Sequence, residues 1–292
     1  MLLAQGTFYE GARWHEGRWY VSDFYAHRVL AVDPDGNAEE VLSIPQPSGL
    51  GFLPDGTLLA VSMTGHAVWR RGVDGDPELY ADLSAISRGE ANDMVVDASG
   101  RAYVGHYGFD LMAGERPRAA TLIRVDPDGS VHAAAEGVRF PNGSLITEDG
   151  ATLIVAETIA ARFSAFTIGV DGSLSDRRIW GQVAPTPELD DLDERYSQVD
   201  FAPDGCTLDA DGCIWAGDSL HRRAARIAPG GQILEQIPAP EDRAFYGAML
   251  GGDDGRTLLL CAAPDWREAR PEGELASELY TTRVEVPHAG FP

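Results

Sequence analysis

Six polar side chains occur at equivalent points of a pattern that repeats along the 292-residue chain. They are Glu10, Ser48, Asn92, Asn142, Asp204 and Tyr246. If the fold brings these positions together, two carboxylates will lie close to each other, with no Lys or Arg at an equivalent position. Ionised carboxylates in that situation need a counter-charge or must hold protons. A bound divalent cation is the simplest counter-charge.

The donor atoms of this set indicate which cation it would take. The carboxylates of Glu10 and Asp204 and the side-chain carbonyl of Asn142 supply only oxygen, and water would complete the shell. Oxygen ligands suit Ca²⁺, Mg²⁺ or Mn²⁺, whereas Zn²⁺ more often takes His or Cys. Zn²⁺ and Fe(II) stay open as occupants. In the alternative interpretation, the Asn-Gly and Asp-Gly pairs at 142–143 and 204–205 are only turn dipeptides.

Each of the six residues begins one copy of the repeat. A polar or Gly residue is followed by an apolar strand, a turn with Asp-Gly or a relative, and a second apolar strand. The copies are EGARWHEGRWYVSD, SGLGFLPDGTLLAVS, NDMVVDASGRAYVGH, NGSLITEDGATLIVAE, DGCTLDADGCIWAGD and YGAMLGGDDGRTLLLCA. Their spacing is close to the roughly 40–50 residues of a four-stranded propeller blade. The one long interval contains TPELDDLDER, which we expect to be a solvated loop.

Two further strands follow each hairpin. The third strands, such as RVLAVDPDG and LIRVDPDG, end in the turns that tight hairpins need, and outer strands such as QILEQIP come next. Six repeats of four antiparallel strands predict an all-β, six-bladed β-propeller that forms a single domain over residues 1–292. Only LYTTRVEVP follows the sixth hairpin, so we expect Leu2-Leu3-Ala4 to supply the missing outer strand and close the ring.

Composition excludes several classes of partner. A formal net charge of −23 repels nucleic acid and anionic membrane surfaces, and no run approaches the roughly 20 apolar residues of a membrane span. The charge alone identifies no metal site, since dispersed surface carboxylates are expected. Cys206, Cys213 and Cys261 cannot all pair, and the N-terminus does not resemble a signal peptide. Together these features predict a cytoplasmic protein that binds neither nucleic acid nor a membrane.

Two long loops are predicted to overhang the metal-binding face, because they follow second strands of blades. The first begins at His106 and offers Tyr107, Phe109, Leu111 and Met112; the second begins at Ala263. The loop before Asp204 adds Tyr196. We expect His106, Tyr107 and Phe109 to contact substrate, so that the mouth has an apolar or aromatic wall. The alternative is a lid that packs these side chains onto the propeller.

The motifs around these residues resemble those of the family of senescence marker protein 30, gluconolactonase and luciferin-regenerating enzyme. The resemblance covers nearly the whole chain and depends on four segments. They are YEGARW around Glu10, AND around Asn92, FPNG around Asn142 and PDGCTLDADGCIWAG around Asp204. It implies a six-bladed propeller with a divalent metal held by Glu10, Asn142 and Asp204. It also implies that Asn92 contacts substrate or a metal-bound water.

The same resemblance implies an activity, the hydrolysis of lactones. In the expected mechanism the metal polarises the lactone carbonyl, and Asp204 is both ligand and general base. Activation of water by the metal alone, without a protein base, is the alternative. Animal sugar-lactone members of the family carry Arg where this chain has Glu90. Together with Phe109, Leu111 and Met112 near the mouth, this difference predicts a preference for less polar lactones over gluconolactone. Two other functions stay open: an aryl-esterase or organophosphate hydrolase, and a propeller that binds a ligand without catalysis.

Overall fold

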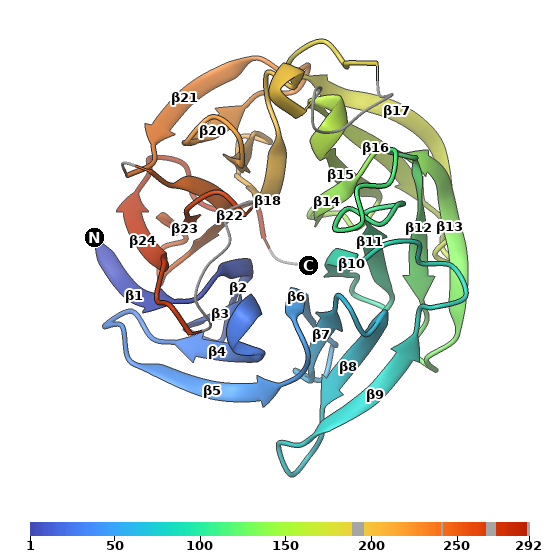
Figure 1. Cartoon of the computed structure of the whole chain (residues 1–292), viewed down its shortest axis with the longest axis horizontal. Coiled ribbons are helices and arrows are strands. Elements are labelled where there is room, and N and C mark those ends of the chain that lie inside the picture. The colour runs from blue at the N-terminus through green and yellow to red at the C-terminus, as the bar shows by residue number, and fades with distance from the viewer. Residues whose placement is uncertain (189–195, 241, 267–272, 291–292) are drawn as a thin grey trace.

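The computed structural model describes residues 1–188, 196–240, 242–266 and 273–290. In this part of the chain the strands form six four-stranded antiparallel sheets arranged around a central axis (Figure 1). The prediction of a six-bladed β-propeller is therefore confirmed. Of the expected loop insertion TPELDDLDER (186–195), residues 189–195 lie outside the described residues.

Four strands in chain order build each of the first five blades. Blade 1 consists of β2 (Tyr9–His15), β3 (Arg18–Asp23), β4 (Arg28–Val32) and β5 (Ala38–Ser43). Blade 2 consists of β6 (Pro47–Phe52), β7 (Leu58–Ser62), β8 (Ala67–Arg71) and β9 (Pro77–Asp82). Blade 3 consists of β10 (Ala91–Val96), β11 (Ala102–His106), β12 (Ala120–Val125) and β13 (Val131–Val138).

The remaining blades repeat this order, except that the last one uses both ends of the chain. Blade 4 consists of β14 (Pro141–Ile146), β15 (Thr152–Glu157), β16 (Arg162–Ile168) and β17 (Leu174–Gln182). Blade 5 consists of β18 (Pro203–Leu208), β19 (Ile214–Asp218), β20 (Arg223–Ile227) and β21 (Ile233–Pro238). Blade 6 consists of β22 (Ala244–Gly251), β23 (Thr257–Ala263), β24 (Ser277–Arg283) and β1 (Leu2–Gly6).

Pairing of the two chain ends closes the ring, as the sequence predicted. Strand β1 is antiparallel to β24, with Leu2 opposite Tyr280 and Gly6 opposite Ser277. The terminal amine of Met1 also donates to the carbonyl of Thr281 (2.6 Å). A closed ring leaves blade 6 complete, so its third strand β24 is not an exposed edge.

Helical structure among the described residues is limited to three short 3₁₀ turns, η1 (Phe24–Ala26), η2 (Thr158–Ala160) and η3 (Tyr196–Gln198). In the same residues no helix is long and apolar enough to cross a membrane. All three cysteines are buried and none is in a disulfide.

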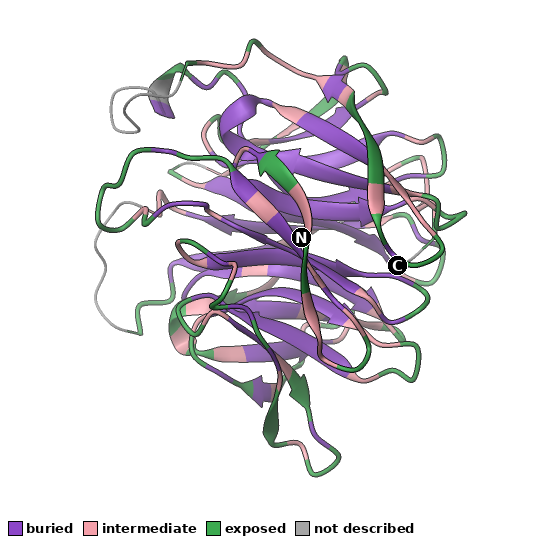
Figure 2. Cartoon of the chain, turned by 90° about the vertical axis from the view of Figure 1, so that its right-hand side faces the viewer, coloured by how far each residue is buried: buried purple, intermediate pink, exposed green. Residues whose placement is uncertain are grey.

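The hydrophobic core consists of separate clusters between neighbouring blades. One cluster joins Phe163 of blade 4 to Ile214 of blade 5, and another joins Trp19 of blade 1 to Leu259 of blade 6. Both faces of a blade are therefore buried, which explains why the inner strands read as nearly continuous apolar runs. Figure 2 shows this burial along the strands, with exposed residues concentrated in the loops and outer strands.

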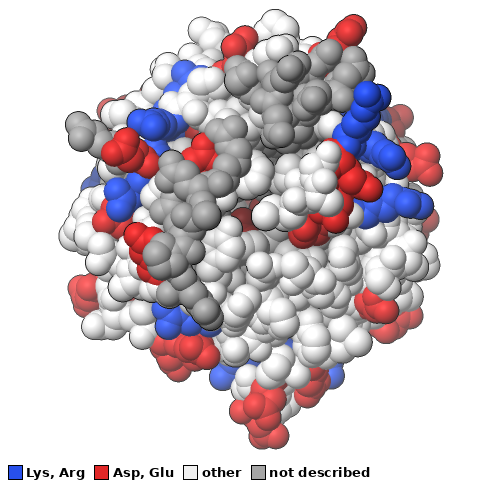
Figure 3. All heavy atoms as spheres, in the orientation of Figure 1, with Lys and Arg blue, Asp and Glu red and all other residues white. Residues whose placement is uncertain are grey.

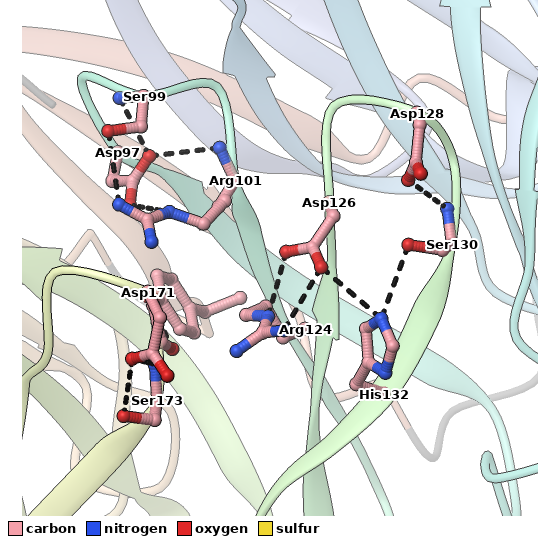
Figure 4. A network of polar contacts seen from close by, with 12 residues as sticks. Asp97, Ser99, Arg101, Arg124, Asp126, Asp128, Ser130, His132, Asp171 and Ser173 are labelled. Atoms are coloured by element: carbon pink, nitrogen blue, oxygen red, sulfur yellow. Dashed lines mark hydrogen bonds and ion pairs between the residues drawn. The ribbon is translucent and has the colours of Figure 1, made fainter.

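Much of the acidic charge stabilises the turns of the propeller. The carboxylate of Asp97 accepts hydrogen bonds from the backbone N–H groups of Ser99 (2.8 Å) and Arg101 (2.9 Å) and pairs with the Arg101 side chain (2.8 Å). Asp126 pairs with Arg124 in the next hairpin (2.8 Å), and Figure 4 shows the two groups side by side. These carboxylates have local structural partners and need no metal.

The inner strands approach one another closely at the axis, and this explains the glycines beside the candidate ligands. A Cβ on Gly143 would lie 2.4 Å from the carbonyl oxygen of Asp204, and one on Gly205 would lie 2.9 Å from the Cα of Gly247. Gly143 lies in β14 and Gly205 in β18. The turn-dipeptide interpretation is therefore wrong, because these glycines lie in strands where a neighbouring backbone leaves no room for a side chain.

Candidate active site

The side chains at equivalent points of the inner strands meet at the floor of one pocket. Each inner strand has a register irregularity next to this point, between Glu10 and Arg13 in β2 and between Pro203 and Cys206 in β18. Such bulges re-aim side chains. The pocket has a volume of about 180 Å³, and five of the six predicted positions line it: Glu10, Asn92, Asn142, Asp204 and Tyr246. Figure 3 shows a hollow near the middle of this face with acidic atoms in its depth.

The two floor carboxylates have few partners. The Oε1 atom of Glu10 is buried and accepts no hydrogen bond. Asp204 accepts one from the N–H of Gly205 through Oδ1 (2.9 Å). The amide nitrogen of Asn142 donates to Oγ1 of Thr158 (3.3 Å), so its carbonyl oxygen is the atom that would serve as a ligand. Thr158, which the sequence did not single out, donates in turn to the carbonyl of Pro203 (2.8 Å).

Electrostatics at the floor are unfavourable without a cation. Burial, reinforced by the charge of Asp204, raises the pKa of Glu10 to about 8. Burial also raises the pKa of Asp204 to about 8, with a contribution from Asp93. Asp93 itself is neutralised by Arg13 (2.9 Å), which lies on the inner strand beyond Glu10 and also donates to the carbonyl of Ala12 (2.7 Å). Arg13 is thus already paired.

These features fit a hard divalent cation. The donor set is two carboxylates and an amide oxygen, with an unsatisfied carboxylate oxygen among them, which matches the preference of such ions for oxygen. Among the described residues, no group of three or more His, Cys, Asp or Glu side chains is placed to hold a metal. The candidate centre therefore depends on Asn142 as its third protein ligand.

Asn92 also lines this pocket. Its amide nitrogen donates to the carbonyl of Pro141 (3.2 Å), and its Oδ1 lies 3.5 Å from Oγ of Ser48. These contacts fix the amide at the pocket floor, where its position fits contact with substrate.

A buried carboxylate in blade 5 anchors the segment that leads to Asp204. Asp218 ends β19, and its side chain is fully buried. Its Oδ1 accepts a hydrogen bond from the N–H of Ala202 (3.1 Å), two residues before Asp204. Its Oδ2 pairs with Arg223 (2.9 Å). The position of Asp204 is therefore coupled to the Asp218–Arg223 pair.

The blades that carry the other two candidate ligands, Glu10 and Asn142, have the same arrangement. Asp23 accepts from the N–H of Thr7 (2.8 Å) ahead of Glu10 and pairs with Arg28 (2.9 Å). Glu157 accepts from the N–H of Arg139 (2.7 Å) ahead of Asn142 and pairs with Arg162 (2.9 Å). We call Asp23, Glu157 and Asp218 the three anchoring carboxylates. In each case the paired Arg follows the acid by five residues, a spacing that is visible in the sequence.

Aromatic and apolar side chains form the walls of the pocket. Tyr107 stacks on Phe140 with ring centroids 4.3 Å apart, and Tyr196 packs edge-on against Trp266 at 6.2 Å. All four line the pocket together with Leu111 and Met112. The long loop after β11 therefore contributes to the wall, as does the described start of the loop after β23.

Two of the expected substrate contacts lie behind this wall. His106 is 1% exposed, and its Nδ1 contacts the backbone of Arg88 (2.9 Å to the carbonyl) and Gly108 (3.1 Å to the N–H). Phe109 is also 1% exposed and packs in a cluster with Phe140 and Ile159. Neither residue lines the pocket. The side chains of His106 and Phe109 point into the protein, and their contacts there hold the loop that presents Tyr107 and Leu111 to the pocket.

Comparison with known proteins identifies the family of the chain. A family model described as SMP-30/Gluconolactonase/LRE-like region matches residues 8–264. The chain belongs to this family. It is 28% identical over 269 residues to pentonolactonase XacC of Haloferax volcanii, covering 91% of this chain and 85% of that protein. It is 25% identical over 277 residues to 6-deoxy-6-sulfogluconolactonase of Pseudomonas putida, covering 94% and 89%.

Solved structures of the family share the fold. The calcium-binding protein regucalcin of Agrobacterium tumefaciens matches with a TM-score of 0.78 at 18% identity, covering 100% of this chain and 95% of that one. The family resemblance inferred from the sequence motifs is confirmed.

Proposed function

We propose that this protein is a lactonase, a carboxylic ester hydrolase that opens cyclic esters with the help of one divalent cation. The observation that carries the proposal is the pair of buried carboxylates, Glu10 and Asp204, which face the pocket without a counter-charge beside an amide that can act as a ligand. The names of the pentonolactonase and sulfogluconolactonase relatives support the reaction class.

Glu10, Asn142 and Asp204 would hold the cation. When bound, a divalent ion supplies electrophilic assistance, polarising the ester carbonyl and stabilising negative charge on its oxygen. Cations that prefer oxygen ligands, Ca²⁺, Mg²⁺ and Mn²⁺, fit this donor set best. The calcium-binding relative of known structure supports a cation in this fold.

The chain's own residues account for binding and proton transfer. Asn92 positions the lactone at the floor through its fixed amide. Asp204 accepts a proton from the water that attacks the acyl carbon, and it returns that proton to the ring oxygen as the acyl C–O bond breaks. The product is the open-chain hydroxy acid. Removal of a general base of this kind costs about 10²–10⁴ in rate.

The walls of the pocket favour lactones less polar than gluconolactone. Tyr107, Leu111, Met112, Phe140 and Trp266 present apolar surface around the floor. An aryl ester would fit the same aromatic wall, and it is the second candidate substrate class.

One assay tests these points together. Hydrolysis of a sugar lactone, an aliphatic lactone, an aromatic lactone and an aryl ester is followed with a pH indicator, each with Ca²⁺, Mg²⁺, Mn²⁺, Zn²⁺ or Fe²⁺ added to chelator-treated protein. We expect metal-dependent turnover with the highest kcat/KM on an aliphatic or aromatic lactone. Turnover of the aryl ester alone would replace the lactonase assignment, and no turnover of any substrate would leave a binding protein.

A further inference from the structure

Glu90 is a third carboxylate in the pocket wall, and its backbone position is tightly fixed. The carbonyl of Glu90 accepts a hydrogen bond from the N–H of Tyr107 (3.0 Å), and the next residue, Ala91, donates to the carbonyl of Met63 (3.3 Å). Gly89 has a φ of +68°, and a Cβ there would lie 1.9 Å from the carbonyl oxygen of Phe109. The chain is therefore held so that Glu90 faces the pocket.

The carboxylate of Glu90 has an unsatisfied acceptor. Its Oε2 atom is buried and has no hydrogen-bond partner. Burial raises the pKa of the group, and the charge of Asp110 acts in the same direction. A buried polar atom without a partner is unfavourable, so a ligand that donates a hydrogen bond there would remove that cost.

The charge balance of the pocket leaves Glu90 uncompensated. Among the described residues that line it, three are carboxylates, Glu10, Glu90 and Asp204, and none is Lys, Arg or His. One divalent cation offsets two negative charges, those of Glu10 and Asp204. Tyr107 lies within electrostatic range of all three acids, since each of them adds to the increase that burial causes in its pKa. The side chain of Glu90 thus faces the same confined space as the reacting centre.

We propose that Glu90 forms a substrate subsite that binds a single hydrogen-bond donor, a hydroxyl or an ammonium group, on an otherwise apolar lactone that is neutral or cationic, and that it excludes lactones with an anionic substituent. An ionised carboxylate is an acceptor only, so it selects donors. A second anion in this dry space would be repelled by the like charge of Glu90, which disfavours its binding. The subsite refines the lactonase function proposed above and depends on it.

The substrate preference proposed for Glu90 differs from the one that the name of a relative indicates. The Pseudomonas enzyme is named for a lactone that carries a sulfonate, which is an anion. Glu90 predicts that the present chain rejects such a substrate. Thr64, which follows Met63 and lines the pocket next to this segment, adds a hydroxyl that can share the binding of a donor group.

A matched series of γ-butyrolactones tests the subsite. The four probes carry hydroxymethyl, aminomethyl, ethyl or carboxylate at the γ-carbon, and the wild type is compared with Glu90→Gln. The control is Glu115→Gln, which removes one acidic charge from the loop after β11, at an exposed residue outside the pocket. For each protein the kcat/KM of every probe is expressed relative to that of the ethyl lactone.

A hydrogen bond to a charged group contributes about 1.5–3 kcal/mol, so the wild type should prefer the hydroxymethyl and aminomethyl lactones over the ethyl lactone by roughly 10–100-fold. The carboxylate lactone should be the poorest substrate. Glu90→Gln should remove the preference for the aminomethyl lactone and raise the relative rate on the carboxylate lactone by at least about tenfold. Glu115→Gln should keep the wild-type order.

The corresponding γ-lactams, which resist hydrolysis, separate this proposal from the lactonase assignment. Their binding to metal-loaded wild type and Glu90→Gln is measured by calorimetry. The same order of affinities without any lactone turnover would support the subsite and refute the lactonase function. Turnover with equal preference for the ethyl and carboxylate probes, or an order unchanged in Glu90→Gln, would overturn the subsite.

Discussion

Asp218→Asn tests whether the anchoring carboxylates hold the candidate ligands in place. The substitution keeps the shape of the side chain, and an amide oxygen can still accept from the N–H of Ala202. It removes the charge that pairs with Arg223 (2.9 Å) and contacts His221 (3.0 Å). The side chain of Asp218 is fully buried, so Arg223 loses its carboxylate partner in a largely dry environment.

The expected loss of stability is moderate. Removing one partner of a buried ion pair costs about 3–5 kcal/mol, but Arg223 keeps a hydrogen bond to Gln236 (3.0 Å) and lies 5.7 Å above the ring of Phe201. We therefore expect a loss of about 2 kcal/mol, which lowers the Tm by about 3 °C in a protein of 292 residues. If Asp218 positions Asp204, cation affinity should also fall, by about 10–100-fold, as for other residues that orient metal ligands.

Asp209→Asn is the matched control in the same blade. Asp209 is also fully buried and pairs with Arg226 (2.7 Å), but it follows β18 at the end away from the pocket, about 16 Å along the strand from Asp204. This variant should lose similar stability and keep wild-type cation affinity. Titration calorimetry with Mn²⁺ and thermal melts give the two readouts. Unchanged affinity in Asp218→Asn, or an equal loss in Asp209→Asn, would refute the positioning role.

Three further predictions concern the floor and the anchors. Asp204→Asn should fold and bind the cation more weakly, with a rate lower by about 10²–10⁴; turnover within a few-fold of wild type at verified full occupancy would exclude Asp204 as the base. Asn92→Ala should keep the cation affinity and lose kcat/KM, and a large loss of affinity would instead make Asn92 a ligand. Burial alone would raise the pKa of Glu157 and of Asp218, but hydrogen bonds, chiefly from Arg162 and His221 respectively, lower both below their ordinary values of 4.5 and 3.8. The ionised carboxylates therefore stabilise the folded state above pH 4.5 and 3.8, and this stabilisation is lost as the pH falls through their lowered pKa values. The double variant Glu157→Gln/Asp218→Asn should flatten the acid side of the stability–pH curve, and an unchanged slope would contradict this role of the two carboxylates.

The repeat allowed the fold and the pocket floor to be predicted, because a blade places equivalent residues at equivalent points around the axis. Glu10, Asn142 and Asp204 meet for that reason alone. The orientation of loop side chains could not be predicted from the sequence in this way, because the loops do not follow the repeat. His106 and Tyr107 are adjacent in the sequence, yet one turns into the protein and the other lines the pocket, since the contacts of His106 with Arg88 and Gly108 depend on the folded loop.

The sequence contains a pattern at the anchoring carboxylates whose meaning appears only in the fold. Each acid precedes an Arg by five residues, but only the folded blades show that the acid also binds the segment before a ligand. The glycines beside the ligands show the opposite case. Gly143 and Gly205 have the sequence of turns, and only the distance to the neighbouring strand explains them.

The most direct test of the account is anomalous diffraction from crystals of the Mn²⁺-loaded protein. If Glu10, Asn142 and Asp204 hold one divalent cation, we expect one strong peak on the propeller axis, with oxygen atoms of these three side chains at about 2.0–2.6 Å from it. The peak should be lost in the double variant Glu10→Gln/Asp204→Asn. A peak coordinated by other residues, or an empty channel in metal-replete protein, would contradict it.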